Sequence, residues 1–168
     1  MSSPMPRRDE TDGSRSRLTA PTRGRHSITQ PVWFLAFPGC QMLDVIGPHE
    51  VFALANQLAD AGPPRYALTV VAPTRGPLVA SSGLSIVADR SLSRATGPVD
   101  TLIVAGGADL RRTIRDRRLV GWIRRTARRA RRVASVCAGA FLLAEAGLLD
   151  GRRVASAPGQ CLDVAIGE

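Results

Sequence analysis

Residues 132–143 read RVASVCAGAFLL, and this stretch decides the expected fold. Its first half is a run of small and β-branched apolar residues that is typical of a buried strand, and its second half has the composition of a helix. Between them, Cys137 precedes a turn of small residues, Ala138, Gly139 and Ala140. Because small residues allow a sharp turn and a close approach of the backbone, the stretch predicts a strand that presents one thiol at a sheet edge and passes directly into a helix.

The position of Cys137 favours a reactive thiol. A cysteine attacks as the thiolate, and a helix N-terminus supplies partial positive charge and unpaired N–H groups that favour the anion. The sequence therefore indicates Cys137 as a candidate nucleophile. The alternative is a small hydrophobic residue packed at the end of a strand, because cysteine is among the most buried residue types.

Other apolar segments alternate along the chain with helical patterns. Continuous apolar runs that end at proline or glycine predict buried strands over residues 31–37, 66–72 and 101–105. Residues 43–58 predict a helix with Pro48 in its first turn, and a hairpin is expected around Ser82-Gly83. The apolar stripe expected on that helix consists of Val51, Phe52, Leu54, Ala55 and Leu58. Strands that alternate with helices predict an α/β fold: a doubly wound, flavodoxin-like, mostly parallel sheet with helices on both faces.

Candidate functional residues follow three of the expected strands. In doubly wound sheets ligands bind beyond the carboxyl ends of the strands, which places Asp44, Gly106-Gly107 and Cys137 around one crevice. There Asp44 can transfer a proton, and the N–H groups of Gly106, Gly107 and Ala138 can stabilise an oxyanion. The alternatives are a helix-capping role for Asp44 and an ordinary loop at the two glycines.

Composition indicates one globular domain, with 168 residues of which 44% are hydrophobic. The three cysteines, Cys40, Cys137 and Cys161, form no CxxC pair, so we expect neither a disulfide nor a metal site, and no cofactor is indicated. The cysteine usage favours a reducing cytoplasm, and no apolar run is long enough for a membrane span. Residues 1–29 are rich in arginine and polar residues and predict a disordered tail.

All 23 basic residues are arginine, and the formal net charge is +9. Eleven arginines lie within residues 111–132, where Leu119, Val120 and Ile123 keep helical spacing. This pattern favours an amphipathic helix with a solvated arginine face over a phosphate-binding surface, because no nucleic-acid-binding motif accompanies the arginines.

Several ordered motifs together resemble a known family. They are FPG at residues 37–39, LD at 43–44, GP at 47–48, EVF at 50–52, SSGL at 81–84, GG at 106–107, SVCAGAFLLA at 135–144 and GLLDGRR at 147–153. The chain resembles the ThiJ/PfpI superfamily, in the branch that forms the glutamine amidotransferase-like N-terminal domain of AraC-type transcription regulators and that is also similar to isocyanide hydratases. The resemblance implies Cys137 as the nucleophile at a strand–helix elbow, Asp44 as its acidic partner, and a domain over residues 30–156.

Two departures from the family pattern refine the expected function. Ala138 stands where hydratases usually have threonine, and Ala157 stands where the family usually has histidine, so residues 157–168 are expected to be a divergent tail of a C-terminally truncated domain. We therefore expect a ligand- or redox-sensing domain of an AraC-type regulator that lacks the helix-turn-helix part and binds no nucleic acid specifically. The alternative is a cysteine-dependent hydratase. A small-molecule ligand and a homodimer are the partners that the resemblance implies.

Overall fold

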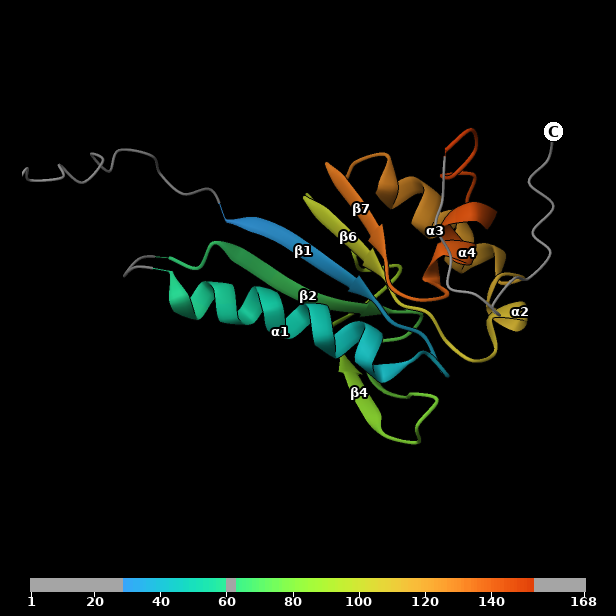
Figure 1. Ribbon diagram of the computed structural model, residues 1–168, viewed down its shortest axis with the longest axis horizontal. Coiled ribbons are helices and arrows are strands. Elements are labelled where there is room, and N and C mark those ends of the chain that lie inside the picture. The colour runs from blue at the N-terminus through green and yellow to red at the C-terminus, as the bar shows by residue number, and fades with distance from the viewer. Residues whose placement is uncertain (1–28, 60–62, 153–168) are drawn as a thin grey trace, which may run out of the picture.

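The computed structural model describes residues 29–59 and 63–152, and Figure 1 shows their arrangement. The strands of the main sheet are β1 (Gln30–Leu35), β2 (Tyr66–Ala72), β5 (Arg90–Ser91), β6 (Thr101–Val104) and β7 (Arg132–Ser135), and a hairpin is formed by β3 (Gly76–Val79) and β4 (Ser85–Ala88). The helices are α1 (Met42–Leu58), α2 (Leu110–Thr113), α3 (Arg117–Ala127) and α4 (Gly139–Glu145). The main sheet has the order β5-β2-β1-β6-β7, and its paired strands are parallel. The predicted α/β doubly wound class is confirmed.

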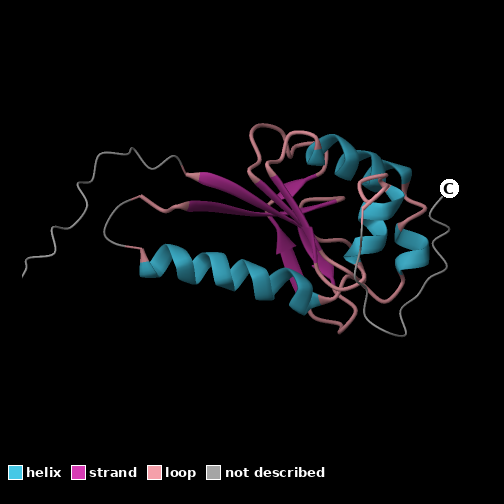
Figure 2. Cartoon of the chain, turned by 45° about the horizontal axis from the view of Figure 1, so that its top comes forward, coloured by secondary structure: helices cyan, strands magenta, loops and turns pink. Residues whose placement is uncertain are grey.

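The central strand β1 shows how the helices are distributed over the sheet. Successive side chains of a strand point to opposite faces. Trp33 stacks on Trp122 of α3 with ring centroids 6.1 Å apart, whereas Phe34 contacts Phe52 of α1, also at 6.1 Å. Helices α1 and α3 therefore cover opposite faces of the sheet, as Figure 2 shows.

Helix α3 follows the expected amphipathic pattern. Its N-terminus is capped by Asp116, whose Oδ1 accepts hydrogen bonds from the N–H groups of Arg118 and Leu119. The buried residues of the helix are Leu119, Val120, Trp122, Ile123 and Thr126, and the arginines lie on the other side. The prediction of an amphipathic helix with an exposed arginine face is confirmed.

Helix α1 corrects one sequence prediction. Of the stripe expected to face the core, only Phe52 is packed against it, while Val51, Leu54 and Leu58 are exposed by 67%, 52% and 77%. The side of α1 that contacts β1 and β2 instead carries Val45, Phe52 and Asn56, and the Asn56 side chain bonds the backbone of Tyr66. The helix is thus apolar on both sides. The spacing of apolar residues in the sequence picked out the exposed side rather than the side that packs on the sheet.

Strand β7 corrects a second prediction. The strand before Cys137 was expected to be buried, yet Arg132, Val133 and Ala134 are exposed. The reason is its place in the sheet, because β7 pairs only with β6 and forms an edge of the sheet in the described part of the chain. The short elements β5 and α2 were not predicted, since two and four residues carry no readable periodicity.

Two predicted segments fall largely or wholly on residues that the structure does not describe. They are the arginine-rich tail at residues 1–29, of which only residue 29 is described, and the tail at residues 157–168. Among the described residues, none of the helices is both long and apolar enough to span a membrane.

Candidate functional site

Parallel pairing brings three strand ends to one edge of the sheet. Strand β1 pairs with β6, and β6 pairs with β7, so their carboxyl ends lie side by side. The chain after β1 leads to Asp44 in the first turn of α1, the chain after β6 leads to Gly106, and the chain after β7 leads to Cys137. The structure therefore gathers the segments that the sequence placed around one crevice.

Gly106 is the point where the three segments meet. Its N–H donates a hydrogen bond of 2.9 Å to Oδ2 of Asp44, and its carbonyl accepts one of 2.9 Å from the N–H of Gln41. A Cβ atom added at Gly106 would lie 2.8 Å from the backbone nitrogen of Ala138 and 3.0 Å from Oδ2 of Asp44. Only glycine fits such a contact, and this close approach fixes the Asp44 carboxylate beside the backbone that follows Cys137.

Cys137 occupies a strained turn between β7 and α4. Its φ angle is +52°, and it is the one residue other than glycine with a positive φ in the described part of the chain. Such a conformation is uncommon for a side chain with a Cβ atom and persists only where the surroundings impose it. The turn is imposed by Gly139, whose Cα lies so close to β6 that a Cβ atom there would overlap the carbonyl of Val104. Cys137 is exposed, so it is not the packed core residue of the alternative interpretation.

Asp44 is a buried carboxyl group, with 7% of the residue exposed. Burial raises its pKa, and the hydrogen bond from the Gly106 N–H opposes that rise. Its Oδ2 bonds across to the end of β6 and the N-cap residue of α1 is Gln41, so the geometry differs from the capping alternative. A buried carboxyl with a raised pKa is suited to exchange a proton with a neighbouring group.

Gly107 and Cys40 form the other side of this edge. They pair in an isolated antiparallel bridge, and a Cβ atom at Gly107 would lie 2.8 Å from the carbonyl oxygen of Gly39. Cys40 is fully buried, and its pKa is raised by burial and, less strongly, by the charge of Asp44. Sequence reasoning did not place Cys40 beside the site, although its position after Pro38-Gly39 at the end of β1 was a usable signal.

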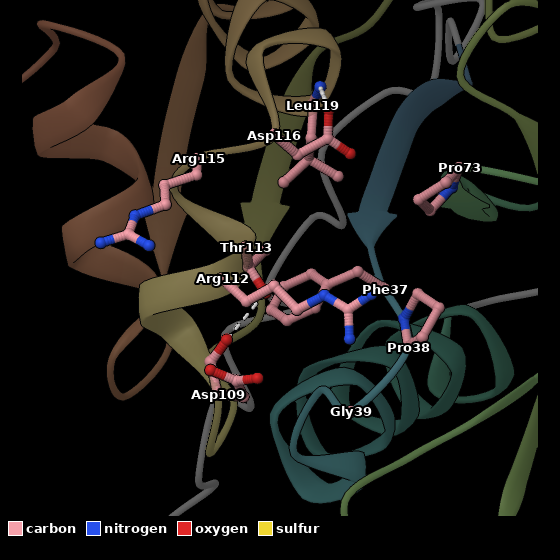
Figure 3. Close-up of a pocket in the computed structure, with 10 residues that line it drawn as sticks. All are labelled: Phe37, Pro38, Gly39, Pro73, Asp109, Arg112, Thr113, Arg115, Asp116 and Leu119. Carbon is pink, nitrogen blue, oxygen red and sulfur yellow. Dashed lines mark hydrogen bonds between the residues drawn. The ribbon is translucent and has the colours of Figure 1, made fainter.

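A pocket of about 630 Å³ lies along the same edge of the sheet, beyond β1 and β2 (Figure 3). Phe37 and Leu119 are buried apolar residues of its wall, and the side chain of Arg112 extends toward Pro38 while that of Arg115 points away. The remaining lining residues are Gly39, Pro73, Asp109, Thr113 and Asp116. Cys137, Asp44 and Gly106 do not line this pocket, so it is separate from the point where the three strand ends meet.

Within residues 29–59 and 63–152, no three His, Cys, Asp or Glu side chains are grouped so that they could hold a metal ion. The groups that the described residues bring to this edge include the Cys137 thiol, the buried carboxyl of Asp44 and the N–H of Gly106.

The fold and the site define a class of protein. It is the class of doubly wound α/β domains in which a cysteine occupies the turn between a parallel strand and a helix, beside an acidic residue from the first helix. The chain belongs to the DJ-1/PfpI family, whose model matches residues 30–167. The resemblance stated from the motifs is thereby confirmed.

Three relatives indicate the range of proteins that contain this domain. The chain is 41% identical over 133 residues to an uncharacterized protein in the cpoL 5' region of Streptomyces lividans, in a match that covers 79% of this chain and 87% of that protein. It is 34% identical to the HTH-type transcriptional regulator CdhR of Pseudomonas aeruginosa and 34% identical to the isonitrile hydratase of Pseudomonas putida. Those matches cover 75% and 73% of this chain but only 36% of the regulator and 50% of the hydratase.

A solved structure agrees with this assignment. A ThiJ/PfpI family protein from Pseudomonas syringae superposes with a TM-score of 0.65 at 26% identity, over 73% of this chain and 48% of that protein. The chain is therefore a DJ-1/PfpI domain related both to helix-turn-helix regulators and to an isonitrile hydratase.

Proposed function

We propose that this chain is a sensing domain of the kind found in AraC-type regulators, and that Cys137 is its reactive group. The observation that carries the proposal is the exposed position of Cys137 at a positive φ angle, where a strained turn holds the side chain at the sheet edge. Strain of this kind is concentrated at functional sites. The relation to CdhR, which is named as a transcriptional regulator, favours sensing as the purpose of the site.

The proposed roles of the neighbouring groups follow from their placement. Asp44 exchanges a proton with the thiol or a bound ligand. Its carboxyl accepts a hydrogen bond from Gly106, and Gly106 also lies against the backbone of Ala138, the residue after Cys137. The N–H groups of Gly106, Gly107 and Ala138 are assigned to the stabilisation of negative charge on a ligand or on oxidised sulfur. The ligand is a small molecule, and the compartment remains the predicted cytoplasm.

Alkylation followed by mass spectrometry tests the reactivity of Cys137, with Cys40 as an internal control. Both thiols belong to the same sheet edge, but Cys40 is fully buried and Cys137 is exposed. We expect iodoacetamide to modify Cys137 first and Cys40 only when the protein unfolds. Equal protection of the two residues in the folded protein would contradict the proposal.

Peroxide treatment tests sensing itself. We expect oxidation to convert Cys137 to a sulfenic or sulfinic acid and to shift the melting temperature, because the added oxygen lies against the start of α4. The Cys137→Ser variant should show no shift at the same peroxide concentration. An identical shift in that variant would assign the effect to another residue.

Nucleic-acid binding is not part of the proposed role of this domain. The arginines of α3 would give only electrostatic binding, which weakens steeply with salt. Mobility-shift assays with unrelated duplexes should therefore show equal, weak binding that is lost between about 50 and 200 mM salt. Preference for one duplex over the others would contradict this part of the proposal.

A cysteine-dependent enzyme is the second candidate, and the buried Asp44 favours it. In that case the Cys137 thiolate attacks an electrophilic carbon and Asp44 transfers protons, as the relation to an isonitrile hydratase suggests. Ala138, in place of the threonine usual in hydratases, weighs against it. Steady-state assays with isonitriles decide between the two, because turnover that disappears in Cys137→Ser and falls in Asp44→Asn would establish the enzyme.

A further inference from the structure

The pocket of Figure 3 lies in a part of the fold where doubly wound sheets bind ligands. The connection after β1 leads through α1 to β2 on one side, and the connection after β6 leads through α3 to β7 on the other side. Ligands of such sheets bind in the crevice between two connections that depart in opposite directions. The pocket is lined by residues 37–39, which follow β1, and by residues between 109 and 119, which follow β6. Its place in the fold therefore indicates a binding site.

The wall of the pocket offers apolar contact. Phe37 and Leu119 are buried, and Pro73 from the end of β2 and Pro38 add two proline rings. The volume of about 630 Å³ is within the range of about 300–1,000 Å³ that is usual for small-molecule pockets. The wall can therefore receive the ring or short hydrocarbon chain of a small molecule.

Arg112 brings an unused positive charge to this apolar wall. Its side chain extends toward Pro38, whereas that of Arg115 points away (Figure 3). In the described part of the chain, the Arg112 guanidinium takes part in no ion pair or hydrogen bond. A guanidinium has five N–H donors and binds a planar carboxylate through two parallel hydrogen bonds. Arg112 is therefore available to hold an anionic group of a ligand.

The other polar side chains of the pocket limit the charge of that ligand. Oδ1 of Asp116 caps α3, and the Thr113 hydroxyl donates a hydrogen bond of 3.1 Å to the carbonyl of Asp109. The carboxylates of Asp109 and Asp116 repel a second negative charge on a ligand. Residues 109–118 nevertheless contain five arginines and two aspartates, so the field of this segment is positive and favours an anion over a cation.

We propose that this pocket is a second binding site, for a small molecule that carries one carboxylate on an apolar, ring-sized body. The carboxylate pairs with the Arg112 guanidinium, and the ring packs on Phe37 and Leu119. The single guanidinium balances a single negative charge. This inference goes beyond the proposed function, whose reactive group is Cys137.

The pocket and the candidate site at Cys137 are separate but share a boundary. A Cβ atom added at Gly107 would lie 2.8 Å from the carbonyl oxygen of Gly39 and 3.1 Å from Cε2 of Phe37. Gly107 thus packs against two residues that line the pocket without lining it itself. Since Cys137 does not line the pocket either, binding there requires no thiol.

Isothermal titration calorimetry of the whole chain with naphthoate tests the proposal. We expect saturable binding at neutral pH, and binding weaker by about 10-fold or more for naphthylmethanol, which has the same rings and no charge. Arg112→Gln should weaken naphthoate binding by about 10- to 100-fold, because it removes a charge-assisted contact. Arg115→Gln is the matched control, because it removes the same charge from a side chain that points away, and it should change the affinity by less than about 2-fold.

Photolabelling locates the bound molecule. An azido derivative of naphthoate should label peptides that contain residues 37–39 or 109–119, and excess naphthoate should suppress the labelling. Labelling confined to α1, where Leu54 and Leu58 are exposed, would overturn the proposal, because the probe would then bind an exposed apolar surface. Circular dichroism of Arg112→Gln should match the wild type, since this side chain is exposed.

The remaining outcomes each contradict the proposal. They are no binding of naphthoate, equal binding of the alcohol, stronger binding of naphthylmethylamine, and equal losses in Arg112→Gln and Arg115→Gln. Stronger binding of the amine would assign the pocket to the carboxylate of Asp109 instead. Cys137→Ser should bind naphthoate with unchanged affinity, so failure of this test and failure of the proposed function are distinguishable.

Discussion

Helices α1 and α3 flank the same central strand, yet they obey different rules. Helix α3 buries Leu119, Trp122 and Ile123 against the sheet and exposes its arginines. Helix α1 packs Phe52 against Phe34 and exposes Leu54 and Leu58 on its other side. The difference teaches that apolar spacing identifies a helix reliably, but it assigns the buried side only where the opposite side is polar.

Charge explains why the two helices diverge. Arginine cannot be buried without a partner, so the arginines of α3 leave a single orientation for that helix. Helix α1 has apolar residues on both sides, and its orientation is decided by contacts that are remote in sequence. These contacts include the bond of Asp44 to Gly106 and the bonds of Asn56 to Tyr66.

The largest expected effect comes from the core of the α3 side. Trp122→Ala removes a 5% exposed ring that stacks on Trp33, and should lower the free energy of unfolding by about 3–5 kcal/mol. Leu54→Ala on α1 should cost less than about 0.5 kcal/mol, measured by urea denaturation. Equal losses of unfolding free energy in the two variants would show that the outer side of α1 is packed against another part of the chain. The described contrast between the two helices would then be wrong.

Glycine replacements sharpen the comparison at the candidate site. Gly106→Ala forces a Cβ atom against Ala138 and Asp44, and should destabilise the protein by about 1–3 kcal/mol while altering the alkylation rate of Cys137. Gly121→Ala in α3 is the matched control, because a Cβ atom there has only the flexible side chain of Arg125 within 4 Å. Thermal denaturation should show this control gaining about 0.5–1 kcal/mol from helix propensity. A destabilised Gly121→Ala variant would contradict the open space described around this residue.

The N-terminal caps of the two helices also differ, because a side chain caps α3 and none caps α1. Asp116→Ala removes two hydrogen bonds to the first turn of α3, and should cost about 1 kcal/mol in urea denaturation. At α1 the N-cap Gln41 makes no side-chain hydrogen bond that caps the helix, and its amide oxygen accepts a hydrogen bond from the exposed Ser81 hydroxyl. Gln41→Ala should therefore cost no more than about half as much. The reverse order would mean that α1 depends on its cap more than α3 does.

The smallest effect is a pH dependence at the start of α1. Burial raises the pKa of Asp44 above its ordinary value of 3.8, so the folded state binds the proton more tightly than the unfolded state. The contribution of Asp44 to stability is therefore greatest below pH 3.8 and is lost as the pH rises through the raised value. In melting curves between about pH 3 and 7, Asp44→Asn should gain relative to the wild type as the pH rises.

Asp100 provides the opposite control. The side-chain hydrogen bond from Arg131 lowers the pKa of Asp100, so its contribution is present at neutral pH and is lost as the pH falls. Asp100→Asn should consequently lose relative to the wild type as the pH rises. The same direction in both variants would contradict the environments described for these two carboxyls.

Much of the fold could be predicted from the sequence, because continuous apolar runs that end at glycine or proline are local signals. Strand β2 begins and ends where the sequence predicted, and the predicted hairpin forms with its turn at Gly83. At the site, the sequence predicted a turn at Cys137 between a strand and a helix, and the structure adds the positive φ angle and the exposure of this residue. The buried neighbour Cys40 was not found, since its proximity to Asp44 depends on how the β1–α1 loop folds back on Gly107.

By itself, the sequence determined the α/β class, the order of the principal elements and the segments that follow each strand, because these depend on residue types within a few positions of one another. Only the tertiary structure decided that β7 lies at the sheet edge, that α1 leaves an apolar side exposed and that Gly106 joins Asp44 to the turn after Cys137. Those features depend on which strands become neighbours and how closely their ends approach. Such distances between remote segments are set by packing and have no local signature in the chain.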